Sequence, residues 1–195
     1  MTKKVLAIFV CFLALFFTVS STKLRSYVVE IKTLAEIEAE NIQLQSIVAE
    51  VGIGNYKGLS EWLSTHIKWK SDRTPADEWK EPHTTLKDGT GDCEDYAVLA
   101  LEVLKRMGVK DVFLLGVSRV DRNLGHVVCI FKESSEQPWR YYDFEKLKTG
   151  PVSFRELIYA VARECRYGSK IGYQLADISR KNVPPGDEKN FTVLD

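Results

Sequence analysis

Hydrophobic residues recur at helical spacing in residues 91–108, GDCEDYAVLALEVLKRMG. The apolar side chains follow the pattern i, i+3, i+4, i+7, which predicts an amphipathic helix: Ala97, Val98, Leu101, Leu104 and Met107. Asp92 is a suitable N-cap residue, and Asp95, three positions later, completes an approximate capping box. Gly108 follows the last turn, where a C-terminal cap belongs. The pattern therefore predicts that Cys93 occupies the first helical position.

Further segments have the composition or spacing of helices. Residues 26–51 lack proline and glycine and carry a partial apolar stripe, which predicts a long surface helix. We expect it to pack on the domain, with a partner-binding or juxtamembrane stalk as the alternative. Residues 59–70 predict a second helix capped by Ser60, and residues 153–165 a third, which begins with a capping box at Ser153. The proline- and glycine-containing residues 71–91 predict a structured loop.

After the Cys93 helix the hydrophobic period changes to two. Residues 111–120 and 124–131 predict an antiparallel hairpin with a turn at 121–123. Residues 139–144 predict a third strand, and residues 171–178 a last one.

The alternation of side chains along these strands assigns polar residues to faces. It places His126 on the same face as Val128 and Ile130, and Asp143 on the same face as Trp139 and Tyr141. If the two strands pair in a suitable register, Asp143 lies beside His126.

Length and charge narrow the classes of function. The chain has 195 residues, enough for one ordinary core, and 27 basic residues balance 27 acidic ones. No basic run or stripe is present, so the sequence argues against nucleic-acid binding.

The N-terminal residues have the features of an export signal. Lys3 and Lys4 precede an uncharged apolar run at 5–19, which is shorter than the roughly 20 residues that a spanning helix needs. We therefore expect residues 1–21 to be a signal peptide or an uncleaved anchor, with membrane contact only through residues 5–19 if it is uncleaved. The remaining organisation is predicted as a helix and linker at 26–57, a domain at 58–180 and a loosely ordered tail at 181–195.

Cys93, His126 and Asp143 are the three parts of a thiol nucleophile system. A thiol at a helix start meets unpaired backbone N–H groups and the positive end of the helix dipole, which favour the thiolate. An imidazole can move its proton, and a carboxylate can orient the imidazole. His83, ten residues before Cys93, is a rival candidate for the base. Composition alone does not establish such a triad.

Three stretches together resemble the transglutaminase-like superfamily: residues 69–108, the Gly125–His126 pair and YYDF at 141–144. The similarity is greatest to bacterial transglutaminase-like cysteine peptidases, which include periplasmic proteases that cleave surface adhesins. GDCEDYA is the most specific part. The resemblance implies an α+β, papain-like fold in which an antiparallel sheet packs against the helix that carries the cysteine. It also implies that Cys93 is the nucleophile, His126 the base and Asp143 the third member.

The acidic residues around Cys93 raise the question of a metal. Asp92, Glu94 and Asp95 lie close to the thiol in the sequence, and their negative charges would raise its pKa. The resemblance implies calcium at Asp92 and Glu94, whose oxygen ligands suit that ion. In the alternative, Asp92 caps the helix and Glu94 is solvated. For an oxyanion hole the candidate donors are the Cys93 backbone N–H and the Trp79 indole N–H.

The sequence thus predicts an exported, periplasmic or membrane-anchored cysteine peptidase. It would hydrolyse a peptide bond in a protein substrate, with a surface adhesin or another envelope protein as the expected class. Apart from calcium, no cofactor is expected. One alternative is acyl transfer to an amine, which crosslinks proteins. The other is a catalytically silent binding or scaffold domain.

Overall fold

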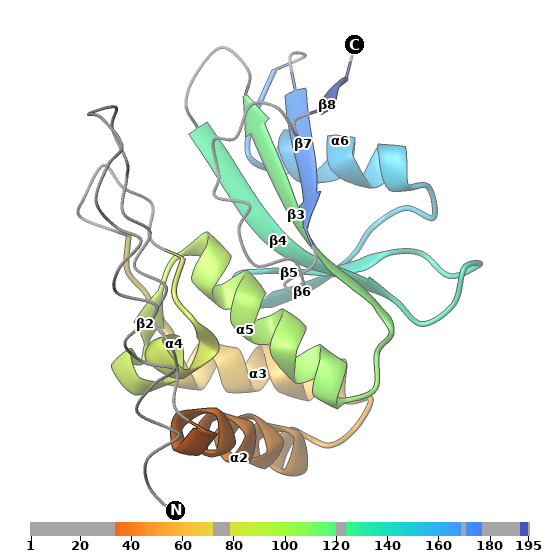
Figure 1. Cartoon of the computed structure of the whole chain (residues 1–195). Helices are drawn as coiled ribbons and strands as arrows, with labels where there is room; N and C mark the ends of the chain where they lie inside the picture. Colours follow the sequence, from red (N-terminus) through yellow and green to blue (C-terminus); the bar gives the residue numbers. More distant parts are fainter. Residues whose placement is uncertain (1–33, 72–78, 120–123, 169–170, 177–191, 195) are drawn as a thin grey trace, which may run out of the picture. The chain divides into compact units, whose positions relative to one another are not determined.

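A six-stranded antiparallel sheet is the framework of the protein (Figure 1). The computed structural model describes residues 34–71, 79–119, 124–168, 171–176 and 192–194, and Leu34–Asp195 form one compact unit. The sheet has the order β6-β5-β4-β3-β7-β8. Its strands are β3 (Asp111–Arg119), β4 (Leu124–Lys132), β5 (Arg140–Asp143), β6 (Lys146–Thr149), β7 (Ile171–Ala176) and β8 (Thr192–Leu194).

Helices cover both faces of this sheet. They are α2 (Leu34–Val51), α3 (Tyr56–His66), α4 (Pro82–Asp88), α5 (Cys93–Arg106) and α6 (Phe154–Glu164). One hydrophobic cluster joins α2, α3 and α5 to the face of β4 that carries Val127, Cys129 and Phe131. A second cluster joins α6 to the opposite face, which carries Val128 and Ile130. The alternation of side chains along β4 thus separates two cores, and the predicted α+β fold is confirmed.

The central helix α5 begins and ends as its sequence predicts. Cys93 is its first residue and Asp92 its N-cap, although the Asp92 side chain makes no capping hydrogen bond to the helix. At the other end, Gly108 has φ 90°, and the N–H groups of Gly108 and Val109 bond to the carbonyls of Lys105 and Leu104. This is a Schellman cap, which needs a residue in the left-handed region. Apolar residues are buried all round α5, so it is a core helix.

Helix α3 differs at both ends from the helix predicted at residues 59–70. It begins at Tyr56, and its N-cap is Asn55, whose side chain accepts a hydrogen bond from the Gly58 N–H. The predicted cap, Ser60, instead donates its hydroxyl to the carbonyl of Glu145 on the β5–β6 turn. The predicted last turn is wrong, because Lys68–Trp69 form β1, which pairs in parallel with β2 (Thr90–Gly91).

Other short elements were not foreseen in the sequence. Helix α4 and strand β2 lie within the predicted loop at 71–91, and β6 follows directly after β5. Strand β8 pairs with β7, although it falls within the predicted loose tail.

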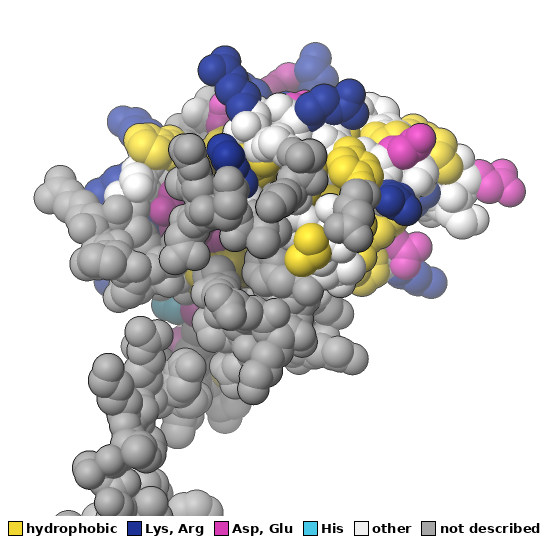
Figure 2. Space-filling view, turned by 90° about the horizontal axis from the view of Figure 1, so that it is seen from above, with side chains coloured by type: hydrophobic (Ala, Val, Ile, Leu, Met, Phe, Trp, Pro, Cys, Tyr) yellow, Lys and Arg dark blue, Asp and Glu magenta, His cyan; other side chains and the backbone are white. Residues whose placement is uncertain are grey.

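Helix α2 packs on the domain. Leu44, Ile47 and Val48 are buried in the core shared with α5, whereas Ile37 and Ile42 are exposed. The predicted signal segment, residues 26–33 and the predicted turn at 121–123 lie outside the described residues. Within the described ranges, no helix has the length and apolar character needed to cross a membrane. On the face shown in Figure 2, the described basic, acidic and apolar side chains are interspersed.

Candidate active site

The candidate site lies where the start of α5 meets the edge of β4. Strand β5 pairs with β4 only from Cys129 to Phe131, so β5 does not extend to the beginning of β4. There the backbone of Val127 lies near enough to Cys93 to act on the pKa of its thiol in the lowering direction. The start of α5 therefore lies next to the first residues of β4.

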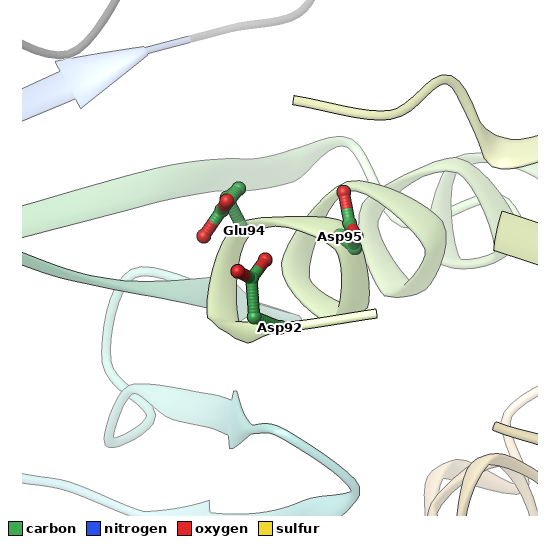
Figure 3. A group of neighbouring side chains, drawn as sticks. All are labelled: Asp92, Glu94 and Asp95. Atoms are coloured by element: carbon green, nitrogen blue, oxygen red, sulfur yellow. The ribbon is translucent and has the colours of Figure 1, made fainter. Parts of the chain in front are cut away.

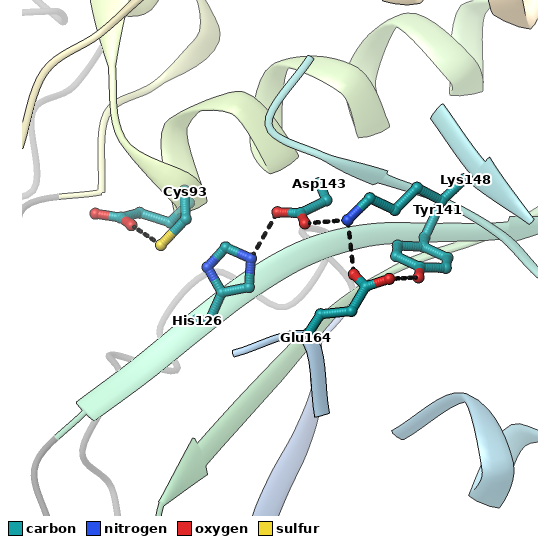
Figure 4. Close-up of polar contacts among 7 residues, drawn as sticks. Cys93, His126, Tyr141, Asp143, Lys148 and Glu164 are labelled. Carbon is teal, nitrogen blue, oxygen red and sulfur yellow. Dashed lines mark hydrogen bonds and ion pairs between the residues drawn. The ribbon is translucent and has the colours of Figure 1, made fainter. Parts of the chain in front are cut away.

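His126 and Asp143 come together through the pairing of β4 with β5. Ile130 lies opposite Tyr141, which places Asp143 near Val128 and on the same face as His126. His126 Nε2 and Asp143 Oδ1 are 2.8 Å apart. The predicted contact between these two residues is confirmed. Figure 4 shows the imidazole between the Cys93 sulfur and the Asp143 carboxylate, with its second nitrogen on the side of Cys93.

An aromatic side chain supports the imidazole from the side of α5. Phe144 follows Asp143 directly and has φ 54°, a left-handed conformation that is uncommon for a bulky residue. Its ring centroid lies 5.4 Å from that of His126 and 5.8 Å from that of Tyr96 on α5. Tyr96 is fixed in turn, because its hydroxyl donates to the Ile67 carbonyl. The turn after β5 thus packs the imidazole against the core.

The Asp143 carboxylate is held in its ionised form. Burial alone would raise its pKa, but the hydrogen bonds and positive charges of His126 and Lys148 outweigh burial and lower the pKa to about 2. Lys148 Nζ lies 2.6 Å from Asp143 Oδ2, so each carboxylate oxygen has its own donor. At neutral pH this group can accept hydrogen bonds and cannot donate one.

The thiol has the opposite electrostatic surroundings. Burial raises the pKa of Cys93 above its ordinary value, and the charge and hydrogen bond of Glu94 raise it further. The Val127 N–H acts in the lowering direction but does not outweigh them. Cys93 Sγ donates a hydrogen bond to Glu94 Oε2 at 3.1 Å. In the sequence, the helix dipole favours the thiolate of Cys93, whereas the acidic neighbours raise the pKa of the thiol. In this structure the effects that raise the pKa prevail, so the neutral thiol is favoured.

Three carboxylates gather at the start of α5. Oxygen atoms of Asp92, Glu94 and Asp95 all lie within 4.8 Å of one another. Figure 3 shows Asp92 and Glu94 together at the first turn, with Asp95 on a different side. A set of carboxylate oxygens has the chemistry that a hard divalent cation prefers. Asp92 and Glu94 therefore fit the predicted role of cation ligands.

Asp95 has a structural role that distinguishes it from the other two acids. It is completely buried and binds Lys80 through both the ammonium, at 2.7 Å, and the backbone N–H, at 2.9 Å. A Cβ atom added to Gly91 would come within 2.5 Å of Asp95 Cβ, so glycine is needed for this close approach. Asp95 thus fastens the segment before the cysteine to α5.

The remaining predicted residues lie in different surroundings. Trp79 and Cys93 both pack against the core cluster that α5 shares with β4, and the buried indole N–H of Trp79 has no hydrogen-bond partner among the described residues. His83 Nδ1 lies 3.7 Å from Glu40 Oε2 on α2. The structure therefore brings His126, and not His83, to Asp143.

Lys80, Phe144, Lys148 and Glu164 contribute to this region and were missed in the sequence. Lys148 Nζ binds Glu164 Oε2 at 2.6 Å as well as Asp143. The only sequence feature that could have indicated Lys148 is its spacing of two from Lys146 after YYDF, which is typical of a strand. The same pattern also suits an exposed turn.

Comparisons with known proteins agree with the sequence resemblance. A family model described as Transglutaminase-like domain matches residues 21–136. The search of curated proteins gave no match.

Solved structures were also compared with this one. Legionella pneumophila LapG is 21% identical, with 57% of this chain and 67% of that chain covered and a TM-score of 0.45. An EGTA-treated structure of Legionella pneumophila LapG is 22% identical, with coverages of 77% and 82% and a TM-score of 0.47. A candidate cysteine protease from Cytophaga hutchinsonii is 12% identical, with coverages of 80% and 58% and a TM-score of 0.41.

Proposed function

This chain belongs to the transglutaminase-like domain family, and from that premise we propose that it is a cysteine peptidase that hydrolyses a peptide bond in a protein substrate. The observation that carries the proposal is the 2.8 Å contact between His126 Nε2 and Asp143 Oδ1, next to a cysteine at a helix start. Cys93 is the proposed nucleophile, His126 the base and acid, and Asp143 the residue that orients the imidazole.

The contact between His126 and Asp143 supports a definite role for each imidazole nitrogen. An ionised Asp143 only accepts hydrogen bonds, so Nε2 of His126 carries the proton and Nδ1 is the basic nitrogen. Nδ1 then takes the proton of the Cys93 thiol. Asp143 stabilises the imidazolium that results, without taking its proton.

The reaction then follows the usual course of thiol acyl chemistry. The Cys93 sulfur attacks the peptide carbonyl carbon, and the carbonyl oxygen becomes negatively charged. The Cys93 backbone N–H and the Trp79 indole N–H are the proposed donors to that oxygen, and the buried indole N–H has no other partner among the described residues. His126 gives its proton to the leaving amine. It then takes a proton from water as the water oxygen attacks the thioester carbon. The C–S bond breaks, the acid is released, and the Cys93 thiolate recovers the proton from His126.

The acidic residues support a role for calcium in preparing the thiol. Glu94 accepts a hydrogen bond from the Cys93 thiol and raises the pKa of that thiol. Glu94 therefore competes with His126 for the thiol proton. We propose that Asp92 and Glu94 hold a calcium ion. A bound cation would offset their negative charge and favour the thiolate.

We also propose that the protein acts after export, because residues 1–21 have the features of a signal peptide or an uncleaved anchor. An adhesin or another envelope protein is the expected substrate. The same residues could pass the acyl group to an amine, which would crosslink proteins, or the domain could act only by binding.

One experiment separates these outcomes. Proteins released from cells that produce the wild type or Cys93→Ala would be compared by mass spectrometry, with new N-termini and isopeptide bonds both recorded. We expect new N-termini with the wild type only, while the circular dichroism spectrum of the variant stays unchanged. Isopeptide bonds would indicate crosslinking, and identical profiles would contradict an enzymatic role.

A further inference from the structure

We propose that Lys148 is a positioning residue: its ammonium fixes the Asp143 carboxylate so that Oδ1 faces His126, and Glu164 holds the ammonium in place. This inference rests on the proposed function, because it assigns Lys148 and Glu164 to the support of the same His126 and Asp143 pair. Neither residue contacts the thiol in Figure 4, and both act through Asp143.

The groups form a continuous row from the sheet to the end of α6. Lys148 lies opposite Tyr141 in the pairing of β5 with β6 and points to the face that carries Asp143. Its Nζ is 2.6 Å from Asp143 Oδ2 and 2.6 Å from Glu164 Oε2. Glu164 ends α6, and its other oxygen, Oε1, accepts the Tyr141 hydroxyl at 3.1 Å. Two strands and one helix therefore define the position of the ammonium.

This arrangement fixes the rotation of the Asp143 side chain. A carboxylate can turn about its Cβ–Cγ bond, and a single donor on one oxygen leaves that rotation poorly defined. Here His126 binds Oδ1 and Lys148 binds Oδ2, so both oxygens are assigned. Charge-assisted hydrogen bonds of this kind are short and strong, which suits them to holding a geometry.

The row also alternates in charge. Once His126 has taken a proton, imidazolium, carboxylate, ammonium and carboxylate follow one another from His126 to Glu164. Glu164 shares the ammonium with Asp143, so the positive charge of Lys148 is balanced from both sides. The imidazolium that forms during the reaction thus faces a carboxylate whose own surroundings are already neutralised in part.

Removing the ammonium would change the protonation of Asp143 in a predictable direction. The titratable groups that face Asp143 are His126 on β4, Tyr141 on β5, Lys148 on β6 and Cys165 at the end of α6. Burial raises the pKa of Asp143, and among the described residues His126 and Lys148 lower it. Without Lys148 the carboxyl group would keep its proton to higher pH and would orient His126 poorly there.

The test measures alkylation of Cys93 by iodoacetamide in the full chain at pH 5 and pH 7, with modification read from the Cys93 peptide by mass spectrometry. Lys148→Met keeps an unbranched side chain, one atom shorter, and removes its charge. We expect its rate at pH 7 to fall about tenfold, as for the loss of one charge-assisted hydrogen bond, and to fall further relative to wild type at pH 5. Lys148→Arg should restore most of the rate.

Two variants control for general effects of charge and packing. Lys146→Met makes the same change on an exposed residue of β6 and should match the wild type. Glu164→Gln leaves the ammonium with Asp143 and should show a smaller loss, equal at both pH values.

A wild-type rate for Lys148→Met would overturn the inference. So would a loss that is equal at both pH values and accompanied by a lower melting temperature, since Lys148 would then only stabilise the fold. If His126→Gln also leaves the rate unchanged, the proposed function fails; if only Lys148→Met does, the positioning role alone fails.

Discussion

The histidine end and the thiol end of the proposed site differ in how their charges are arranged. At the histidine end, Asp143 lies between two hydrogen-bond partners, His126 and the Lys148 ammonium, and its pKa is lowered to about 2 despite burial. At the thiol end, burial and the Glu94 carboxylate raise the pKa of Cys93. The histidine end therefore favours the ionised form of the Asp143 carboxyl group, and the thiol end favours the neutral form of Cys93.

This difference indicates where control of the activity would lie. The His126–Asp143 contact is made within the paired sheet, and Lys148 of the neighbouring strand binds the second oxygen of Asp143. The thiol is held by the first turn of a helix and donates its proton toward Glu94. A change of charge at the first turn of α5 would therefore alter the nucleophile without moving the base.

The largest effect should come from removing the base. We expect His126→Gln to lower hydrolysis of the identified substrate by about 10²–10⁴-fold, because proton transfer to and from the thiol and the leaving amine would be lost. The measurement is the rate at which new N-termini appear. Melting temperature would show whether the variant stays folded.

His83→Gln is the matched control for this variant. It replaces the same side chain on α4, where His83 faces Glu40 of α2, and it should leave hydrolysis unchanged. If His83→Gln is inactive and His126→Gln is active, the assignment of the base is wrong.

The central parts of the site could be predicted because they depend on short-range patterns. The cap and apolar spacing of residues 91–108 placed Cys93 at the helix start, and alternation along two strands placed His126 and Asp143 on matching faces. The structure adds the register, with Ile130 opposite Tyr141, that brings these faces together.

The supporting residues could not be predicted, because their contacts depend on how distant elements pack. Glu164 contacts Lys148 only once α6 has packed on the sheet. In the sequence, a lysine in a strand of only four residues cannot be distinguished from an ordinary solvent-exposed lysine. Ser60 was misread as a cap for a similar reason, since its hydroxyl bonds to Glu145, far along the chain. Local propensity favours Ser60 as a cap, and tertiary contact decides otherwise.

A smaller effect should come from neutralising the carboxylate at the thiol end. Glu94→Gln removes a charge and a hydrogen bond that both raise the pKa of Cys93. We expect iodoacetamide to alkylate Cys93 about tenfold faster at pH 7 in the presence of a calcium chelator, which corresponds to a pKa lower by about one unit. The rate would be followed on the Cys93 peptide.

The same variant tests the proposed calcium site. In the wild type, added calcium should raise the rate of alkylation, whereas Glu94→Gln should lose most of this response. Glu102→Gln makes the same change of charge further along α5, where Glu102 pairs with Arg106, and should behave as the wild type. If neither calcium nor a chelator changes the alkylation rate of the wild type, the calcium proposal is excluded.

The smallest effect concerns the stability that the histidine end gives to the fold. Asp143 has a lower pKa in the folded protein than the value of about 3.9 expected when unfolded, so its contribution is present above that value and is lost as the pH falls toward 2. Because the side chain is 17% exposed, we discount the contribution and expect a change of about 1 kcal/mol between pH 6 and pH 3. Urea unfolding of the wild type and of Asp143→Asn would measure it. The variant cannot titrate at this position, so the difference between the two free energies of unfolding should narrow by that amount on acidification. If the two proteins lose stability in parallel, Asp143 is not held in its ionised form by its partners, and the contrast between the two ends of the site does not hold.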